Sequence, residues 1–134
     1  MGTIVVGYVP KPEGRAALRR AAEEASLRGA SLLVVNSHRG GREFDSEDAV
    51  KSEEELEAIR AQLREFGVEH EVRQLVRGVD PAEDLVAVAE EVNADFIVIG
   101  LRRRTPVGKL ILGSNAQRVL LDSPCPVLAV KAEE

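Results

Sequence analysis

The chain has 134 residues, of which 44% are hydrophobic, and its formal net charge is -5. This length and apolar content suit a packed core, so we expect a single domain over residues 1–134. The net negative charge argues against binding to nucleic acid, which relies on a concentrated cationic surface. Charges interrupt every apolar run well before the roughly 20 residues that a membrane-spanning helix needs, so no membrane partner is expected.

Cys125 is the only cysteine in the chain. A single cysteine excludes an intrachain disulfide and leaves no metal-binding knuckle. The opening residues, Met-Gly-Thr-Ile, lack the basic segment and the long apolar run of a signal peptide. We therefore expect a reducing, cytoplasmic environment. Between two prolines at the head of an apolar strand, the thiol is expected to be buried and unreactive.

Hydrophobic periodicity predicts five strands that alternate with four helices. In chain order the predicted elements are strand 3–8, helix 13–28, strand 31–36, helix 46–66, strand 68–76, helix 81–93, strand 95–99, helix 114–121 and strand 126–130. Most of these strands are continuous apolar runs, which is typical of strands covered on both faces. The third strand instead places valines on one face and charged residues on the other, as in a half-exposed strand at a sheet edge.

The alternation of strands and helices predicts a doubly wound α/β fold with a largely parallel sheet and helices on both faces. In such folds ligands bind outside the carboxyl ends of the strands, where the strand order reverses. We therefore expect the loops at residues 7–12 and 100–114 to line one crevice. This expectation assumes that the first and fourth strands are neighbours in the sheet.

Residues 100–115 follow the apolar run at residues 96–99 and precede a helical pattern. Gly100 and Gly113 would let backbone approach an anion closely, and the start of a helix offers unpaired N–H groups. The arginines at residues 102–104 add positive charge beside them. The spacing is neither that of a Walker A loop nor that of a Gly-x-Gly-x-x-Gly dinucleotide turn. A phosphate site of another kind is predicted.

The chain resembles the universal stress protein family, whose motif has the form Gly-x2-Gly-x9-Gly-Ser/Thr after the fourth strand. Gly100 and Gly113 followed by Ser114 have the outer spacing of this motif, and residues 94–100 and 123–130 are similar to the segments that lead into it and end the family's chains. The similarity runs nearly end to end. It implies a three-layer sandwich with a five-stranded parallel sheet in the order 3-2-1-4-5 and about four helices. It also implies a homodimer that pairs through the last strand.

The resemblance leaves open two branches of the family, one that binds ATP and one that binds no nucleotide. The middle glycine of the motif is Arg103 here, and its side chain could either block a phosphate or pair with it. In the first loop, Val9 replaces an aspartate of the ATP-binding branch and cannot accept a hydrogen bond. Losing that bond would weaken binding by about one to two orders of magnitude.

The predicted ligand-binding residues come from the ends of the first, second and fourth strands and from the start of the last helix. They are Gly7, Val9, Asn36, Gly100, Arg102, Arg103, Gly113, Ser114 and Asn115. Each also has an explanation that needs no ligand. The glycines could simply turn the chain, Ser114 could cap a helix, the arginines could be solvated, and Asn36 could start a turn.

These features favour a stress-response module that binds ATP or another adenine nucleotide and acts by occupancy, with Mg²⁺ present only together with the nucleotide. The alternative is a member of the ATP-free branch that uses no cofactor and binds a protein partner not yet known. A slow nucleotide hydrolase is a third hypothesis. No catalytic or metal site is predicted, because the two histidines lack ligand-spaced companions and neither loop carries paired carboxylates.

Overall fold

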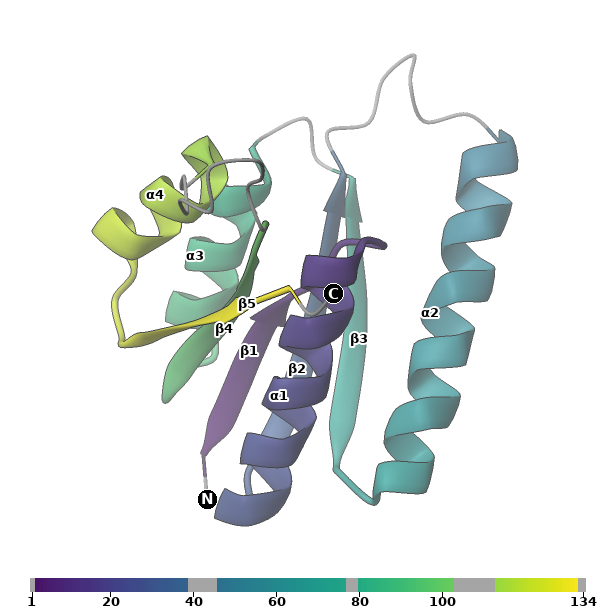
Figure 1. Ribbon diagram of the computed structural model, residues 1–134, viewed down its shortest axis with the longest axis horizontal. Coiled ribbons are helices and arrows are strands. Elements are labelled where there is room, and N and C mark those ends of the chain that lie inside the picture. The colour runs from purple at the N-terminus through teal and green to yellow at the C-terminus, as the bar shows by residue number, and fades with distance from the viewer. Residues whose placement is uncertain (1, 39–45, 77–79, 103–112, 133–134) are drawn as a thin grey trace.

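The computed structural model describes residues 2–38, 46–76, 80–102 and 113–132. Along the chain the elements are β1 (Thr3–Gly7), α1 (Pro12–Arg28), β2 (Ser31–His38), α2 (Ser46–Phe66), β3 (His70–Val76), α3 (Pro81–Glu91), β4 (Phe96–Leu101), α4 (Ser114–Asp122) and β5 (Val127–Lys131). The strands form one parallel sheet in the order β3-β2-β1-β4-β5 (Figure 1). The predicted fold class, strand order and β1–β4 adjacency are therefore confirmed.

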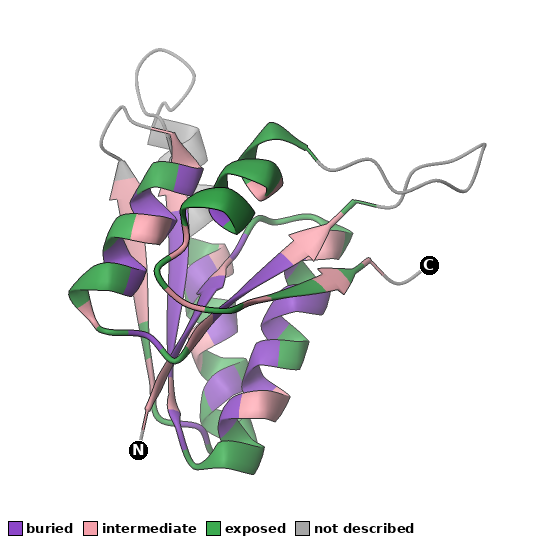
Figure 2. Ribbon diagram, turned by 90° about the vertical axis from the view of Figure 1, so that its left-hand side faces the viewer, coloured by how far each residue is buried: buried purple, intermediate pink, exposed green. Residues whose placement is uncertain are grey.

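The sheet is the middle layer of a three-layer sandwich, with α1 and α2 on one face and α3 and α4 on the other (Figure 1). Successive side chains of a strand point to opposite faces. In β1, Ile4 and Val6 accordingly pack in the core under α1 and α2, whereas Val5 packs in the core under α3 and α4. Figure 2 shows the buried residues concentrated along the central strands and on the helix faces that cover them.

Helix α1 is the most deeply packed helix that the structure describes, with seven buried residues, five of them alanine. Their small side chains let the helix lie close to the strands. Pro12 occupies the first turn, where its missing N–H costs nothing, and Gly29 ends the helix in the left-handed conformation with φ 64°. A backbone N–H of this cap donates to the Ala25 carbonyl oxygen.

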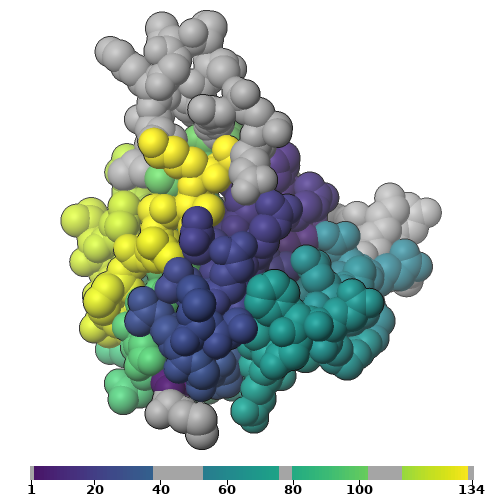
Figure 3. Space-filling model, turned by 60° about the horizontal axis from the view of Figure 1, so that its bottom comes forward, coloured from purple at the N-terminus to yellow at the C-terminus, as the bar shows by residue number. Residues whose placement is uncertain are grey.

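The sheet edges are β3 and β5. Charged side chains occupy one face of β3, where Arg73 contacts Glu71 on its own strand and Glu91 on α3 at 3.0 Å. This arrangement confirms the predicted half-exposed edge strand. At the other edge β5 lies beside α1 on the face seen in Figure 3, and Leu128 is 37% exposed.

Two strands are longer than the apolar runs predict. Strand β2 continues to His38 because it pairs with β3 as far as Val76, and β4 continues to Leu101 because it pairs with β5 as far as Lys131. Gly100 was predicted to open a loop, but it lies within β4. Pairing with the neighbouring strand extends each of them beyond its continuous apolar run.

Candidate functional site

A cavity of about 130 Å³ lies at the carboxyl ends of β1, β2 and β4, against the first turns of α3 and α4. Its described lining residues are Gly7, Tyr8, Val9, Val35, Ser37, Pro81, Ala82, Leu85, Ile99, Gly100, Asn115, Ala116 and Val119. Since β1 runs between β2 and β4, this is the place where the strand order reverses. Of the two segments predicted to line one crevice, residues 7–12 contribute Gly7 to Val9 and residues 100–114 contribute Gly100, while residues 103–112 lie outside the described residues. Most of the lining is apolar.

Glycines allow unusually close approaches around this cavity. A Cβ atom on Gly100 would lie 2.0 Å from the Glu13 carbonyl oxygen, and one on Gly14 would lie 1.8 Å from the Val9 carbonyl oxygen. Backbone cannot move aside as the tip of a side chain can. Both glycines therefore let the start of α1 pack directly against β4 and the first loop. Neither turn geometry nor ligand approach is needed to explain Gly100.

At the end of β1, a Cβ atom on Gly7 would lie 2.9 Å from a methyl group of Leu85. This neighbour is the flexible end of a side chain on α3, so the contact is softer than the one at Gly100. Leu85 is 6% exposed and packs in the core under α3 and α4. Gly7 thereby allows α3 to form one wall of the cavity.

The start of α4 faces the same region. Gly113 holds the N-cap position with φ −69° and ψ 164°, and among the described residues no side chain caps the helix. Ser114 is the first helical residue, so the N-cap position, which the sequence allowed for Ser114, is occupied by Gly113 one residue earlier. The first N–H groups of a helix have no intrahelical partner and carry a partial positive charge. Gly113, Ser114 and Asn115 are all exposed, so this helix end is accessible to an anion.

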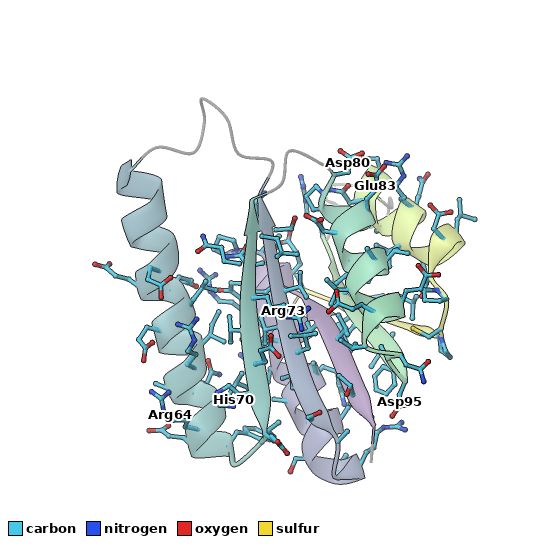
Figure 4. All side chains as sticks on the ribbon, turned by 180° about the vertical axis from the view of Figure 1, so that it is seen from behind. Arg64, His70, Arg73, Asp80, Glu83 and Asp95 are labelled. Atoms are coloured by element: carbon cyan, nitrogen blue, oxygen red, sulfur yellow. The ribbon has the colours of Figure 1, made fainter. Side chains whose placement is uncertain are left out.

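A buried carboxylate lies behind the α3 wall. Asp84 is 2% exposed and accepts a hydrogen bond from the Ser37 hydroxyl at the end of β2. Nearer the start of α3, the Arg118 guanidinium lies 2.6 Å from an Asp80 carboxylate oxygen and 3.4 Å from a Glu83 oxygen. Figure 4 shows Asp80 and Glu83 together at this end of α3, beside α4. Arg118 therefore joins the two helices that border the cavity.

A sequence model of the universal stress protein family matches residues 1–131. The chain belongs to the universal stress protein family. A universal stress protein from Mycolicibacterium smegmatis is 48% identical over 128 residues, covering 96% of each chain. The universal stress protein of Archaeoglobus fulgidus has a solved structure with 43% identity and a TM-score of 0.85, covering 98% of this chain and 99% of that one. Another structure from this organism, in complex with dAMP, has 38% identity and a TM-score of 0.79 and covers 98% of both chains.

The structure brings four of the predicted universal stress protein site residues together. Gly7, Val9, Gly100 and Asn115 line the cavity. Gly113 and Ser114 directly precede Asn115 at the start of α4. Arg103 lies outside the described residues. Contact of any of these residues with a ligand stays a prediction.

Asn36 and Arg102 lie away from the cavity lining. Asn36 is 4% exposed, and strand alternation places it on the face of Val34, under α1 and α2, while Ser37 lies on the cavity side. Arg102 directs its guanidinium toward Glu13, with 3.7 Å between Nε and the carboxylate, and its side chain is 66% exposed. Alternation along β2, counted from its buried core residues, could have identified Ser37 from the sequence.

Tyr8 connects the first loop to α2. Tyr8 is 2% exposed, and its hydroxyl donates to the Glu55 carboxylate on α2. Burial, followed by this hydrogen bond and the Glu55 charge, raises the pKa of the Tyr8 phenol above its ordinary value. A neutral phenol therefore holds the middle of α2 against the end of β1, beside the loop that carries Val9.

Within residues 2–38, 46–76, 80–102 and 113–132, no three histidine, cysteine, aspartate or glutamate residues form a group that could hold a metal ion. Cys125 is half-buried instead of fully buried, and its sulfur lies 3.6 Å from the Ser123 hydroxyl oxygen. Among the helices that the structure describes, none has the length and apolar character of a membrane span.

Proposed function

We propose that this universal stress protein binds an adenine nucleotide in the cavity at the carboxyl ends of β1, β2 and β4 and signals by occupancy, without turning the nucleotide over. One observation carries the proposal: a largely apolar cavity at the reversal of strand order adjoins an exposed helix start whose N-cap residue is a glycine. An apolar slot suits a purine ring, and a helix start suits a phosphate. The relative that was solved with dAMP supports this ligand class.

In the proposed complex the phosphates lie at Gly113, Ser114 and Asn115, and the base lies between Leu85 and the strand ends. The nucleotide is ATP or a related adenine nucleotide, and Mg²⁺ would enter only with its phosphates. Val9 brings a hydrocarbon side chain to the cavity, 40% exposed, so no carboxylate acceptor is available at that position. Affinity should accordingly be modest. Arg102 and Arg103 are proposed to supply charge near the phosphates.

We further propose that the protein acts in the cytoplasm as a homodimer that pairs through β5. Leu128 on this edge strand is 37% exposed, and Leu121 at the end of α4 is 83% exposed. Pairing across a two-fold axis would cover an open sheet edge that otherwise invites aggregation. Light scattering of the purified protein tests this assembly, and a monomer at micromolar concentration would contradict it.

Isothermal titration of nucleotide-stripped protein with ATP, AMP and cyclic AMP, each with and without magnesium, tests the ligand. Saturable binding near one nucleotide per chain is the expected result. Ala116→Phe should abolish binding, because Ala116 lines the cavity and a phenyl ring would fill it. Leu27→Phe, on α1 and 81% exposed, is the control and should bind normally. Absence of heat at concentrations able to detect an affinity of about 100 μM would overturn the proposal.

A second candidate function is that of a protein-interaction module of the ATP-free branch. The hydrocarbon side chain of Val9 at the cavity favours it, as does the presence of Arg103 where the motif has glycine. This function predicts no titration heat with any adenine nucleotide. It also predicts that Ala116→Phe leaves the protein's cellular activity intact.

A further inference from the structure

We propose that Ser37 and Asp84 form a subsite that selects a base carrying an amino group, and so distinguishes adenine nucleotides from their deaminated counterparts. The inference rests on the proposed nucleotide-binding function and deepens it. Ser37 belongs to β2 and lines the cavity, whereas Asp84 belongs to α3 and is buried behind it. The two residues are 47 positions apart and meet only in the folded protein.

The hydrogen bond between the two side chains determines what Ser37 can offer a ligand. A hydroxyl has one proton and two lone pairs, whereas an ionised carboxylate can only accept. The proton of Ser37 is directed at Asp84. The Ser37 oxygen therefore presents lone pairs to the cavity and can accept a hydrogen bond but has no proton left to donate. A ligand atom placed there must be an N–H or O–H donor.

The order of the strands indicates which part of a nucleotide reaches Ser37. The phosphates would lie at the start of α4, and this helix follows β4. In the sheet β1 separates β4 from β2, and neighbouring strands are about 4.8 Å apart. A nucleotide anchored at α4 therefore extends across β1 with its ribose and reaches β2 with its base. On an adenine base that reaches β2, the exocyclic amine is the group that can donate a hydrogen bond to Ser37.

The hydrogen-bonding character of the two ends of the cavity favours the same orientation. Ser37, held by Asp84, offers lone pairs to the positive end of an N–H bond and no proton to a phosphate oxygen. The start of α4 has the opposite character because its N–H groups carry partial positive charge. One end of the cavity thus suits the phosphate and the other suits the amine. Ser37 is the contact residue of this subsite, and Asp84 is a positioning residue that acts through it.

Titrations with matched ligands test the proposal. Wild type should bind AMP about three- to tenfold more tightly than purine riboside 5′-monophosphate, which lacks the amine, and inosine 5′-monophosphate should bind more weakly still because its oxygen is an acceptor. Ser37→Ala should weaken AMP binding by a similar factor and leave the binding of purine riboside 5′-monophosphate unchanged. Ser37→Thr, which keeps the hydroxyl, should retain the wild-type preference for the amine.

Asp84→Asn tests the positioning role of Asp84. The measured quantity is the ratio of AMP affinity to inosine 5′-monophosphate affinity, which a general loss of stability would leave unchanged. An asparagine amide can donate to the Ser37 oxygen and free its proton for the cavity. The ratio of AMP affinity to inosine 5′-monophosphate affinity should then fall by about tenfold or more, because each of two hydrogen-bond preferences is reversed. If Ser37→Ala fails to fold, this ratio and the Ser37→Thr titration still decide the question.

Failure of this inference is distinguishable from failure of the proposed function. If the wild type binds no adenine nucleotide, both are overturned. If it binds AMP but Ser37→Ala weakens AMP and purine riboside 5′-monophosphate equally, or weakens neither, only the subsite is overturned. Loss of the Ser37→Ala effect with 2′-deoxy or 3′-deoxy AMP would assign the contact to a ribose hydroxyl and overturn the amine assignment.

Discussion

The two faces of the sheet are covered very differently. On one face α1 contributes seven buried residues, and α2 adds Leu56, Ile59 and Leu63. On the other face α4 buries only Val119 among its residues, and the carboxyl ends of the strands are left facing a cavity. A short and shallowly packed helix does not cover the strand ends. The proposed binding site therefore lies where the core is least complete.

Glycines serve the two faces in different ways. Gly14 and Gly100 let α1 approach β4 and the first loop so closely that a methyl group would collide with backbone. Gly113, at the start of α4, would carry a methyl group with no heavy atom of the described residues within 4 Å. Glycine is required by packing on the α1 face, whereas at the start of α4 it leaves room that a ligand can use.

The largest expected effect is a loss of folding stability when a buried leucine is shortened, and it should differ between the two faces. Leu63→Ala empties a site enclosed by α2 and the sheet, where Leu63 is 1% exposed, and should lower the free energy of unfolding by about 3–5 kcal/mol. Leu85→Ala removes the same atoms next to the cavity and should cost about 2–3 kcal/mol, because water can occupy the enlarged opening. Urea unfolding measures both. Equal losses would contradict the idea that the two faces are packed to different completeness.

The next largest effect is the difference in folding stability between alanine substitutions at the two motif glycines, Gly100 and Gly113. Gly100→Ala should lower the free energy of unfolding by about 1–3 kcal/mol, because its methyl group would lie 2.0 Å from the Glu13 carbonyl oxygen. Gly113→Ala is the matched control and should change it by no more than about 0.5 kcal/mol. Thermal or urea unfolding of both variants measures the difference. A stable Gly100→Ala protein would show that α1 does not depend on this close approach.

A pH effect should follow from the burial of Tyr8 and its hydrogen bond to Glu55 on the α1 and α2 face. The pKa of the Tyr8 phenol is raised in the folded state, so above pH 10 the unfolded chain loses a proton that the native protein keeps. Stability should therefore be unaffected by this group below pH 10 and fall above it, by at most about 1.4 kcal/mol per pH unit.

Spectroscopy makes this prediction specific, because Tyr8 is the only tyrosine and the chain has no tryptophan. Ultraviolet titration should show no phenolate at pH 10 in the native protein and about half ionisation in urea, where the phenol has its ordinary pKa. Tyr8→Phe should lack the part of the alkaline destabilisation that comes from this phenol. Native ionisation near pH 10 would contradict the buried arrangement.

The smallest effect concerns the helix pair beside the cavity. Arg118→Ala removes the ion pairs with Asp80 and Glu83, but its side chain is 44% exposed, so the loss should be only about 0.2–1 kcal/mol and should shrink in high salt. Arg64→Ala on α2, where the arginine side chain is 58% exposed, is the control and should cost about the same or less. A loss well above 1 kcal/mol would show that the cover of the α3 and α4 face depends on this arginine.

The elements and their order were predictable from the chain because they follow from local patterns. Continuous apolar runs produced the central strands, Gly29 and Gly67 ended helices in the left-handed conformation, and Asp80 with Pro81 began α3. Helix α2 begins and ends at the predicted residues. Such signals lie within a few positions of the element that they define, so no tertiary contact is needed to find them.

The strand order came from the family motif, and the structure confirmed it, but the site was predictable only in outline. The sequence indicated the two loops and four of the residues that line the cavity. It included Asn36 among the ligand-binding residues, whereas the described cavity lining contains Ser37, because alternation along β2 turns Asn36 toward the opposite face. It left open whether Ser114 caps the last helix, and the structure places Gly113 at the N-cap position.

By itself, then, the sequence determined the elements, the layers and the family, since these depend on periodicity and on a spaced motif. Only the tertiary structure decided that Gly100 is needed for the approach of α1 and that Ser37 meets Asp84 behind the α3 wall. Such contacts join residues far apart in the chain. Their distances depend on how helices settle on a sheet, and no local pattern records that geometry.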